Sequence, residues 1–251
     1  MPSKPDFHQT IDPAILYFGT PVVIISTENE DGTYNLAPMS SAWWLHDRCI
    51  LGLGKNAQTW SNLIRTGQCV LNLPTEDMVS YVNLLAKTTG VEDIAPRKAV
   101  MGYTFVKDKF KKSGLHPVES CMIRPPRILE CPIQMEAVLV TSHDLKGDLA
   151  EEQRTASAIE VKIIQVHAKQ SVQLAGQINK IDPDKWKPLI MSFQHFYGLS
   201  SRSEDSKLAT IDEEMYRTVK RQSSLRSPDV SSKSAESNLL AIAALGSMTF
   251  I

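Results

Sequence analysis

The sequence predicts a mainly β domain in which short strands form a barrel and a few helices lie around it. Several short β-branched or apolar runs are separated by turns, which is typical of a barrel. The regular strand–helix alternation of a doubly wound fold is missing. So are the phosphate-binding loops G-x-G-x-x-G and G-x-x-x-x-G-K-[ST]. Apolar residues make up 42% of the 251 residues, which is enough to form a core.

The strands are predicted from β-branched and alternating apolar runs. Residues 21–27 are rich in Val and Ile, and the turn at 28–32 ends in Asp-Gly and leads into a second strand at 33–37. Further runs predict strands at 49–53, 68–73, 127–142 and 158–167.

The clearest helix is predicted over residues 56–66. Trp60, Leu63 and Ile64 follow the i, i+3, i+4 spacing of one helix face, and Gly67 is suited to the helix end. Further helices are predicted over 77–87, over part of 91–101, and over 184–196 despite Pro188.

The composition divides the chain into a domain at 1–200 and a Ser-rich extension at 201–251. Most of the extension is polar, so it cannot bury enough apolar surface to offset the entropy of ordering. We expect this extension to be partly disordered, or packed on the domain or on a partner subunit.

Charge and cysteine content exclude several classes of protein. Lys and Arg number 27 against 28 Asp and Glu, so the chain lacks the basic excess of a nucleic-acid-binding protein. The four cysteines contain no C-x-x-C pair, and no His and acidic residues show a metal-ligand spacing such as H-E-x-x-H. The N-terminus lacks the apolar segment of a signal peptide, and the longest apolar run is too short to span a membrane. We therefore expect a cytoplasmic protein with reduced thiols, no metal and no membrane or nucleic-acid partner.

The segment from Gly32 to Pro74 has the features of a phosphate site. A strand ends at Gly54 and Lys55, and a helix follows directly, so free backbone N–H groups would lie beside the Lys55 amine and the Thr59 hydroxyl. Ser40 and Ser41, after an earlier strand, would add hydroxyl donors.

In this segment the sequence resembles the flavin reductase-like, FMN-binding split-barrel family, which includes flavoredoxin. The most specific matches are ENEDGTYNLAPMSSA at 28–42 and GKNAQTWSNLIRTGQCVLNLP at 54–74. Weaker matches follow in the family's order at 109–118, 125–137, 160–167 and 186–199, so the resemblance extends over about residues 18–199.

The resemblance implies a six-stranded antiparallel split barrel of Greek-key type, a homodimer, and one FMN, or alternatively FAD, near the subunit interface. It places Lys55 and Thr59 at the phosphate, with Gly54 and Asn62 near the same site. Late residues of the family approach the flavin, which makes Tyr197 a cofactor contact. The remaining implied contacts form the stretch along the ring system and the phosphate end: Asn35, Ala37, Pro38, Met39, Ser40 and Ser41.

The implied activity is that of an FMN-dependent oxidoreductase, which moves hydride or electrons through its flavin. NADH or NADPH would be the donor, and a small molecule or a redox partner protein would be the acceptor. Hydride arrival at a flavin requires no acid–base side chain, so catalytic residues stay unassigned, with His195 and His167 as candidates.

The sequence departs from the family at one motif. Many NAD(P)H-using members carry Gly-Asp-His before the penultimate strand, where this chain has Thr155-Ala156-Ser157. This departure favours a tightly held FMN that serves another electron partner or an organic substrate. The alternatives are therefore an FMN-dependent oxygenase, a substrate-specific reductase, and a non-enzymatic electron carrier.

Overall fold

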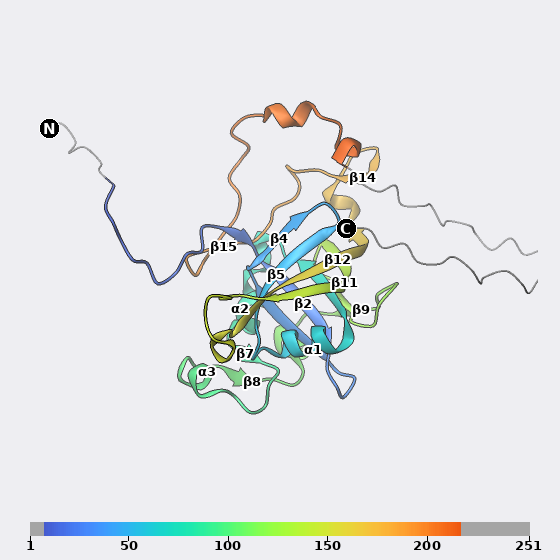
Figure 1. Ribbon diagram of the computed structural model, residues 1–251. Helices are drawn as coiled ribbons and strands as arrows, with labels where there is room; N and C mark the ends of the chain where they lie inside the picture. The colour runs from blue at the N-terminus through green and yellow to red at the C-terminus, as the bar shows by residue number, and fades with distance from the viewer. Residues whose placement is uncertain (1–7, 217–251) are drawn as a thin grey trace, which may run out of the picture. The chain divides into compact units, whose positions relative to one another are not determined.

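A seven-stranded antiparallel sheet forms the centre of the computed structural model, which describes residues 8–216 (Figure 1). The sheet has the order β3-β2-β6-β11-β12-β5-β4. Its strands are β2 (Val23–Glu28), β3 (Tyr34–Met39), β4 (Ala42–Leu45), β5 (Arg48–Gly54), β6 (Gln68–Leu73), β11 (Ile133–Asp144) and β12 (Ala156–Ala168). The predicted mainly β architecture is confirmed. The sheet has seven strands rather than six because Ala42–Leu45 forms a short edge strand on β5.

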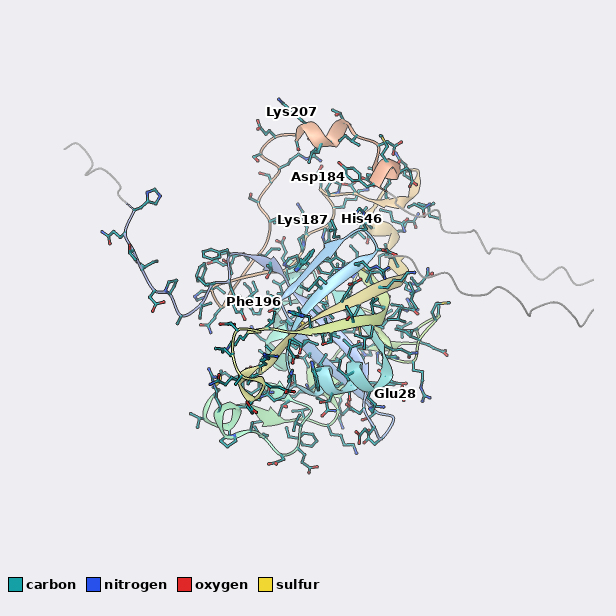
Figure 2. The ribbon with its side chains drawn as sticks, in the orientation of Figure 1. Glu28, His46, Asp184, Lys187, Phe196 and Lys207 are labelled. Carbon is teal, nitrogen blue, oxygen red and sulfur yellow. The ribbon has the colours of Figure 1, made fainter. Side chains whose placement is uncertain are left out.

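The two faces of the sheet bury different sets of residues. Ile25, Leu71 and Met135 are aligned across β2, β6 and β11, and they belong to the apolar cluster inside the barrel. Their neighbours Ile24 and Asn72 lie on the opposite face, because successive side chains alternate along a strand. Side chains fill the space between the strands in Figure 2, where Glu28 and His46 mark opposite ends of the sheet.

Two helices cover the part of the sheet that carries the predicted flavin segment. Helix α1 (Gln58–Thr66) packs against β2 and β3, and it ends at Gly67, whose φ of 67° is the left-handed conformation of a helix C-cap. Helix α2 (Val79–Ala86) follows the short 3-10 turn η1 (Glu76–Met78) and packs against β3 and α4 (Lys109–Ser113). The predicted helix at 91–101 is reduced to α3 (Pro96–Val100).

Prolines account for two differences from the predicted elements. The predicted strand at 127–142 is divided into β10 (Arg127–Ile128) and β11, because Pro132 has no N–H to donate to a continuous ladder. The predicted helix at 184–196 is wrong. This segment forms β15 (Ile190–Ser192) and β16 (His195–Tyr197), and the turn between them has positive φ at Phe193 and Gln194. Pro188 lacks the N–H that an interior helix position requires.

The remaining elements are short. Strand β1 (Thr20–Pro21) pairs with β15. The others are β7 (Thr88–Thr89), β8 (Thr104–Phe105), β9 (Pro117–Val118), β13 (Gln173–Leu174), β14 (Gln177–Ile181), and the 3-10 turns η2 (Glu151–Gln153), η3 (Gln170–Val172), η4 (Lys207–Thr210) and η5 (Glu213–Tyr216).

The first compact unit of the chain runs through Asp212, beyond the predicted domain end at residue 200. Arg202 ties this last part to the domain through an ion pair with Asp184. Most of the predicted Ser-rich extension, residues 217–251, lies outside the described residues. Within residues 8–216, no helix is long and apolar enough to cross a membrane.

Candidate functional site

The predicted site residues Asn35, Thr59 and Asn62 lie together in a buried polar network between β3 and α1. The Asn35 side chain donates to the Thr59 hydroxyl at 3.0 Å, and both residues are buried. Asn62, also buried, donates to the Thr27 hydroxyl at 3.0 Å and to the Asn29 side chain at 2.8 Å. The network therefore fixes the start of α1 against the hairpin of β2 and β3.

One acceptor in this network has no partner among residues 8–216. This atom, Asn35 Oδ1, is buried, although buried polar atoms are nearly always hydrogen-bonded. Gly90 approaches it so closely that a Cβ atom at this position would lie 2.7 Å from Asn35 Oδ1. Gly90 is thus a position where the fold needs the absence of a side chain.

The N-terminus of α1 offers free backbone donors. Its N-cap, Ala57, makes no side-chain capping bond, and no acceptor among residues 8–216 is found for the backbone N–H groups of Gln58, Thr59 and Trp60. The Lys98 amine lies at the same corner, where it donates to the Asn56 carbonyl at 3.1 Å. Burial lowers the pKa of Lys98. Such a helix end beside a cation is suited to an anion.

A cavity of about 230 Å³ opens beside this helix end. Its charged lining residues are Lys98 and Asp93, and its polar lining residues are Asn56, Ser61 and Thr89. The cavity could accommodate a phosphate-bearing group against α1.

A second lysine of this region is almost fully buried. Lys109, at the start of α4, is 3% exposed and donates to the Leu36 carbonyl of β3 at 2.9 Å. Burial, together with the nearby charge of Lys98, lowers the pKa of Lys109 to about 8. Neither lysine was predicted as a site residue. No local pattern marks Lys98, and the only hint for Lys109 is its place in the family-like segment 109–118.

The other predicted flavin contacts lie along β3 and the chain that follows it. Ala37, Pro38 and Met39 form the end of β3, and all three are half-buried. Ser40 accepts a hydrogen bond at its carbonyl from the Thr20 hydroxyl at 2.6 Å.

Ser41 is held close to β5. Its carbonyl accepts from the Gly52 N–H at 2.7 Å, and a Cβ on Gly52 would lie 3.0 Å from the Ser41 Cβ. The chain that follows β3 therefore lies against β5, two residues before the end of β5 at Gly54.

Lys55, a predicted phosphate contact, has an internal partner. Its amine pairs with Asp144 Oδ2 at 2.5 Å, and the Ser157 hydroxyl donates to the other oxygen of the same carboxylate. The hydrogen bond from Lys55 lowers the pKa of Asp144. The Lys55 amine is thus paired with Asp144, while the Lys98 amine lies at the Asn56 carbonyl, just before α1.

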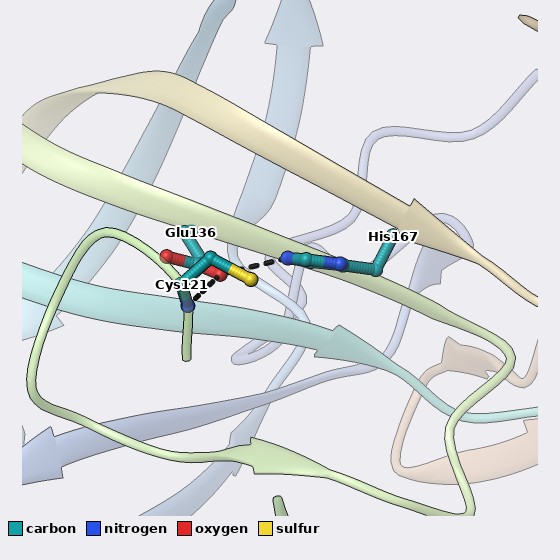
Figure 3. Close-up of side chains that lie close together, drawn as sticks. All are labelled: Cys121, Glu136 and His167. Carbon is teal, nitrogen blue, oxygen red and sulfur yellow. Dashed lines mark hydrogen bonds and ion pairs between the residues drawn. The ribbon is translucent and has the colours of Figure 1, made fainter. Parts of the chain in front are cut away.

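The candidate site residues from the later part of the sequence lie in two places. His195 and Tyr197 are exposed on β16, whose sheet also contains β1 and so reaches Ser40 through Thr20. His167 lies on β12, where its Nε2 is 2.7 Å from Glu136 Oε1 (Figure 3). None of the described contacts joins His167 to the network around Asn35.

Comparison with known proteins decides the family. The flavin reductase-like domain family matches residues 15–200, which is most of the chain. The chain belongs to the flavin reductase-like family. A relative from Bacillus subtilis (strain 168), YdfE, is 39% identical over 189 residues, which cover 75% of this chain and 88% of the relative.

Solved structures confirm the split-barrel fold of this flavin reductase-like protein. Flavoredoxin of Desulfovibrio vulgaris (Miyazaki F) superposes with a TM-score of 0.64 at 18% identity, over 81% of this chain and 99% of the other. Nitrilotriacetate monooxygenase component B from Bacillus cereus gives a TM-score of 0.63 at 19% identity, over 80% and 100%. The 2-nitrobenzoate 2-nitroreductase NbaA of Pseudomonas fluorescens gives 0.58 at 17%, over 77% and 87%.

Proposed function

We propose that this flavin reductase-like protein is an oxidoreductase that binds FMN between β3 and the N-terminus of α1. The observation that carries the proposal is the free helix end of α1 beside the Lys98 amine, directly next to the buried Asn35–Thr59 pair. The family and the split-barrel fold support a flavin rather than another phosphate-bearing ligand.

The residues fit an FMN molecule on two counts. The phosphate would meet the free amides of α1 and the Lys98 amine, which burial leaves short of solvation. No donor in the described part of the chain pairs with the buried Asn35 Oδ1, and an FMN hydroxyl or N–H group would supply one. The stretch from Ala37 to Ser41 would lie along the ring system, with Gly54, Lys55 and Asn62 around the phosphate end.

When bound, FMN supplies the hydride and electron chemistry, and the chain supplies binding and orientation. Asn35, Thr59 and Asn62 hold the start of α1 in place. Backbone N–H groups that face the ring would stabilise negative charge on the reduced flavin. No side chain is assigned to proton transfer, and the exposed His195 stays a candidate.

The proposed partners follow from the fold and from the relatives. The exposed apolar side chains of edge strand β4 support a homodimer. Proteins of this fold include a flavoredoxin, a monooxygenase component and a nitroreductase. We therefore propose a small molecule or a redox protein as the electron acceptor, and NADH or NADPH as the first donors to test.

The decisive experiment is a titration of the purified, flavin-free chain with FMN, followed by flavin fluorescence. One FMN should bind per chain, and FAD serves as the comparison. Anaerobic addition of NADH or NADPH to the loaded protein then separates the alternatives. Bleaching without a partner indicates a reductase, while a flavin that responds only to another reductant indicates a carrier.

The position of the phosphate is tested by three lysine variants. Lys98→Met should weaken FMN binding on the order of tenfold or more, because a charge-assisted contact is lost. Lys112→Met changes an exposed lysine and should leave the affinity unchanged. Lys55→Met weakens binding only if the Lys55 amine leaves Asp144 for the phosphate. Wild-type affinity in Lys98→Met would contradict the proposed phosphate position.

A further inference from the structure

Three side chains from distant parts of the sequence converge outside the proposed flavin site. Glu136 extends from β11, His167 from β12, and Cys121 from the loop between β9 and β10 (Figure 3). One ligand atom from each residue lies within 4.8 Å of the other two. Because Glu136 is opposite Gln165 in the ladder, His167 is its diagonal neighbour, two residues further along β12 on the same face of the sheet.

We propose that Cys121, Glu136 and His167 form a binding site for a divalent transition metal ion, with Zn²⁺ as the best match. Thiolate, carboxylate and imidazole are all zinc ligands. Tetrahedral ligands at zinc bond lengths of roughly 2.0–2.3 Å stand about 3.3–3.8 Å apart. The 4.8 Å limit on the separation of the three atoms is compatible with small side-chain adjustments toward that geometry.

Backbone hydrogen bonds hold the Glu136 carboxylate of this site in place. Glu136 is 0% exposed, and its two oxygens accept the N–H groups of Cys121 at 2.8 Å and Met122 at 2.7 Å. These two bonds fix the carboxylate and bring the loop that carries Cys121 against it. Such outer hydrogen bonds orient ligands in metal sites.

The charges of the cluster suit a dication. A buried carboxylate together with a thiolate carries a charge of −2, which a divalent cation balances. Binding would release the thiol proton of Cys121, because metals bind the thiolate form.

The site has access for a further ligand. The His167 side chain is 21% exposed and lines a cavity of about 340 Å³, with Arg127, Gln134 and Lys169 among the other lining residues. Of the three proposed ligands His167 lines this cavity, so the cavity could admit water or another small ligand to the fourth position that zinc keeps open in three-ligand sites. The two cations, Arg127 and Lys169, favour an anionic fourth ligand.

Spacing in the sequence gave no indication of this site, which is why the sequence predicts no metal. The three residues are separated by 15 and 31 positions, and only the pairing of β11 with β12 and the fold of the loop bring them together. A similar pair, His116 and Glu130, lies 2.6 Å apart but is exposed and has no thiol in its cluster among the described residues. This pair provides a matched control.

The test is a titration of the metal-free, full-length protein with Co²⁺ and then Zn²⁺. One Co²⁺ ion should bind per chain. It should give a sulfur-to-cobalt charge-transfer band together with the visible bands of a tetrahedral site. Zn²⁺ should then displace the Co²⁺. Cys121→Ser should lose the sulfur band, because serine offers no sulfur ligand. The exchange should not disturb packing, since Cys121 is exposed.

His167→Gln should weaken Zn²⁺ binding by about a hundredfold or more, since loss of a ligand costs at least the roughly 10–100-fold that loss of an outer partner costs. His116→Gln should bind as the wild type does. The proposal is overturned if the chain binds no Co²⁺, or if Cys121→Ser and His167→Gln bind as the wild type does. If the wild type is stable without metal and Glu136→Gln changes only the melting temperature, Glu136 merely anchors the loop and the proposal is overturned. Because none of these readouts involves flavin, the result is independent of the proposed oxidoreductase activity.

Discussion

Single residues at the flavin corner differ in how far the sequence reveals them. Asn35, Thr59 and Asn62 lie in specific motifs, and in the structure all three are buried and take part in hydrogen bonds between α1 and the strands β2 and β3. Lys98 and Lys109 reach the same corner from later segments, one beside the free end of α1 and the other beneath β3. Lysine is common on exposed surfaces, so no pattern in the sequence separates these two from the others. Only the tertiary fold assigns them a place.

Lys109 should give the stability of the protein a distinct dependence on pH. Its pKa is lowered from 10.5 to about 8 in the folded state, so between these values the unfolded chain binds more protons. The free energy of unfolding therefore gains a contribution that rises with pH, by about 2 kcal/mol between about pH 7.5 and about pH 9.5. Urea unfolding of the flavin-free wild type and of Lys109→Met at both pH values measures this contribution.

The comparison with Lys109→Met is needed because buried thiols act in the opposite direction. Burial raises the pKa of Cys49 to about 12 and raises the pKa values of Cys69 and Cys131 as well, so their ionisation favours the unfolded chain as pH rises. These effects cancel in the difference between the two proteins. An identical pH response of wild type and Lys109→Met would show that Lys109 is not desolvated in solution.

At the scale of elements, helix α1 has a capped C-terminus and an uncapped N-terminus. Gly67 terminates it in the left-handed conformation that glycine adopts readily, whereas Ala57 cannot cap the N-terminal amides. An uncapped N-terminus costs stability, and it leaves donors available for a ligand. We attribute the alanine to the proposed phosphate site.

Capping variants of Ala57 test this explanation. Its φ of −95° and ψ of 137° are those of an N-cap, so Ala57→Ser and Ala57→Asp should both stabilise the flavin-free protein by about 1 kcal/mol. Only Ala57→Asp places a negative charge beside the phosphate, and it should weaken FMN binding on the order of tenfold or more. Thermal unfolding and FMN titration of both variants measure the two effects. Equal FMN affinities of Ala57→Ser and Ala57→Asp would place the phosphate elsewhere.

The sequence predicted the elements whose signals are local and missed those that depend on packing. Helix α1 has both an apolar face and a glycine at its end, so its pattern is unambiguous. The hairpin of β15 and β16 has an apolar run that is too short to separate helix from strand, and its partner β1 is far away in the sequence. Only two residues separate edge strand β4 from β3, and the two are distinct strands because β3 pairs with β2 whereas β4 pairs with β5.

At the scale of the whole molecule, edge strand β4 presents apolar side chains that the described chain does not cover. Trp43 is 55% exposed and Leu45 is 59% exposed, and the two lie on the same face of the strand. Trp44 points the other way and packs on the barrel core. Exposed apolar edge strands are prone to pair with other chains. The exposed side chains of Trp43 and Leu45 therefore support the proposed homodimer with β4 in its interface.

A charge on β4 should therefore separate the subunits. Trp43→Asp should raise the Kd of the dimer by roughly thirtyfold or more, because a central Trp of an interface typically contributes 2 kcal/mol or more. The matched control is Val100→Asp, whose wild-type side chain is even more exposed, at 89%, but belongs to helix α3, outside the sheet that contains β4 (Figure 1). Sedimentation velocity over a range of protein concentrations measures both variants. If FMN binds near the interface, the Trp43→Asp monomer should also lose affinity for FMN. A monomeric wild type, or a Trp43→Asp protein that dimerises as the wild type does, would exclude β4 from the interface and leave the two exposed side chains for a different partner.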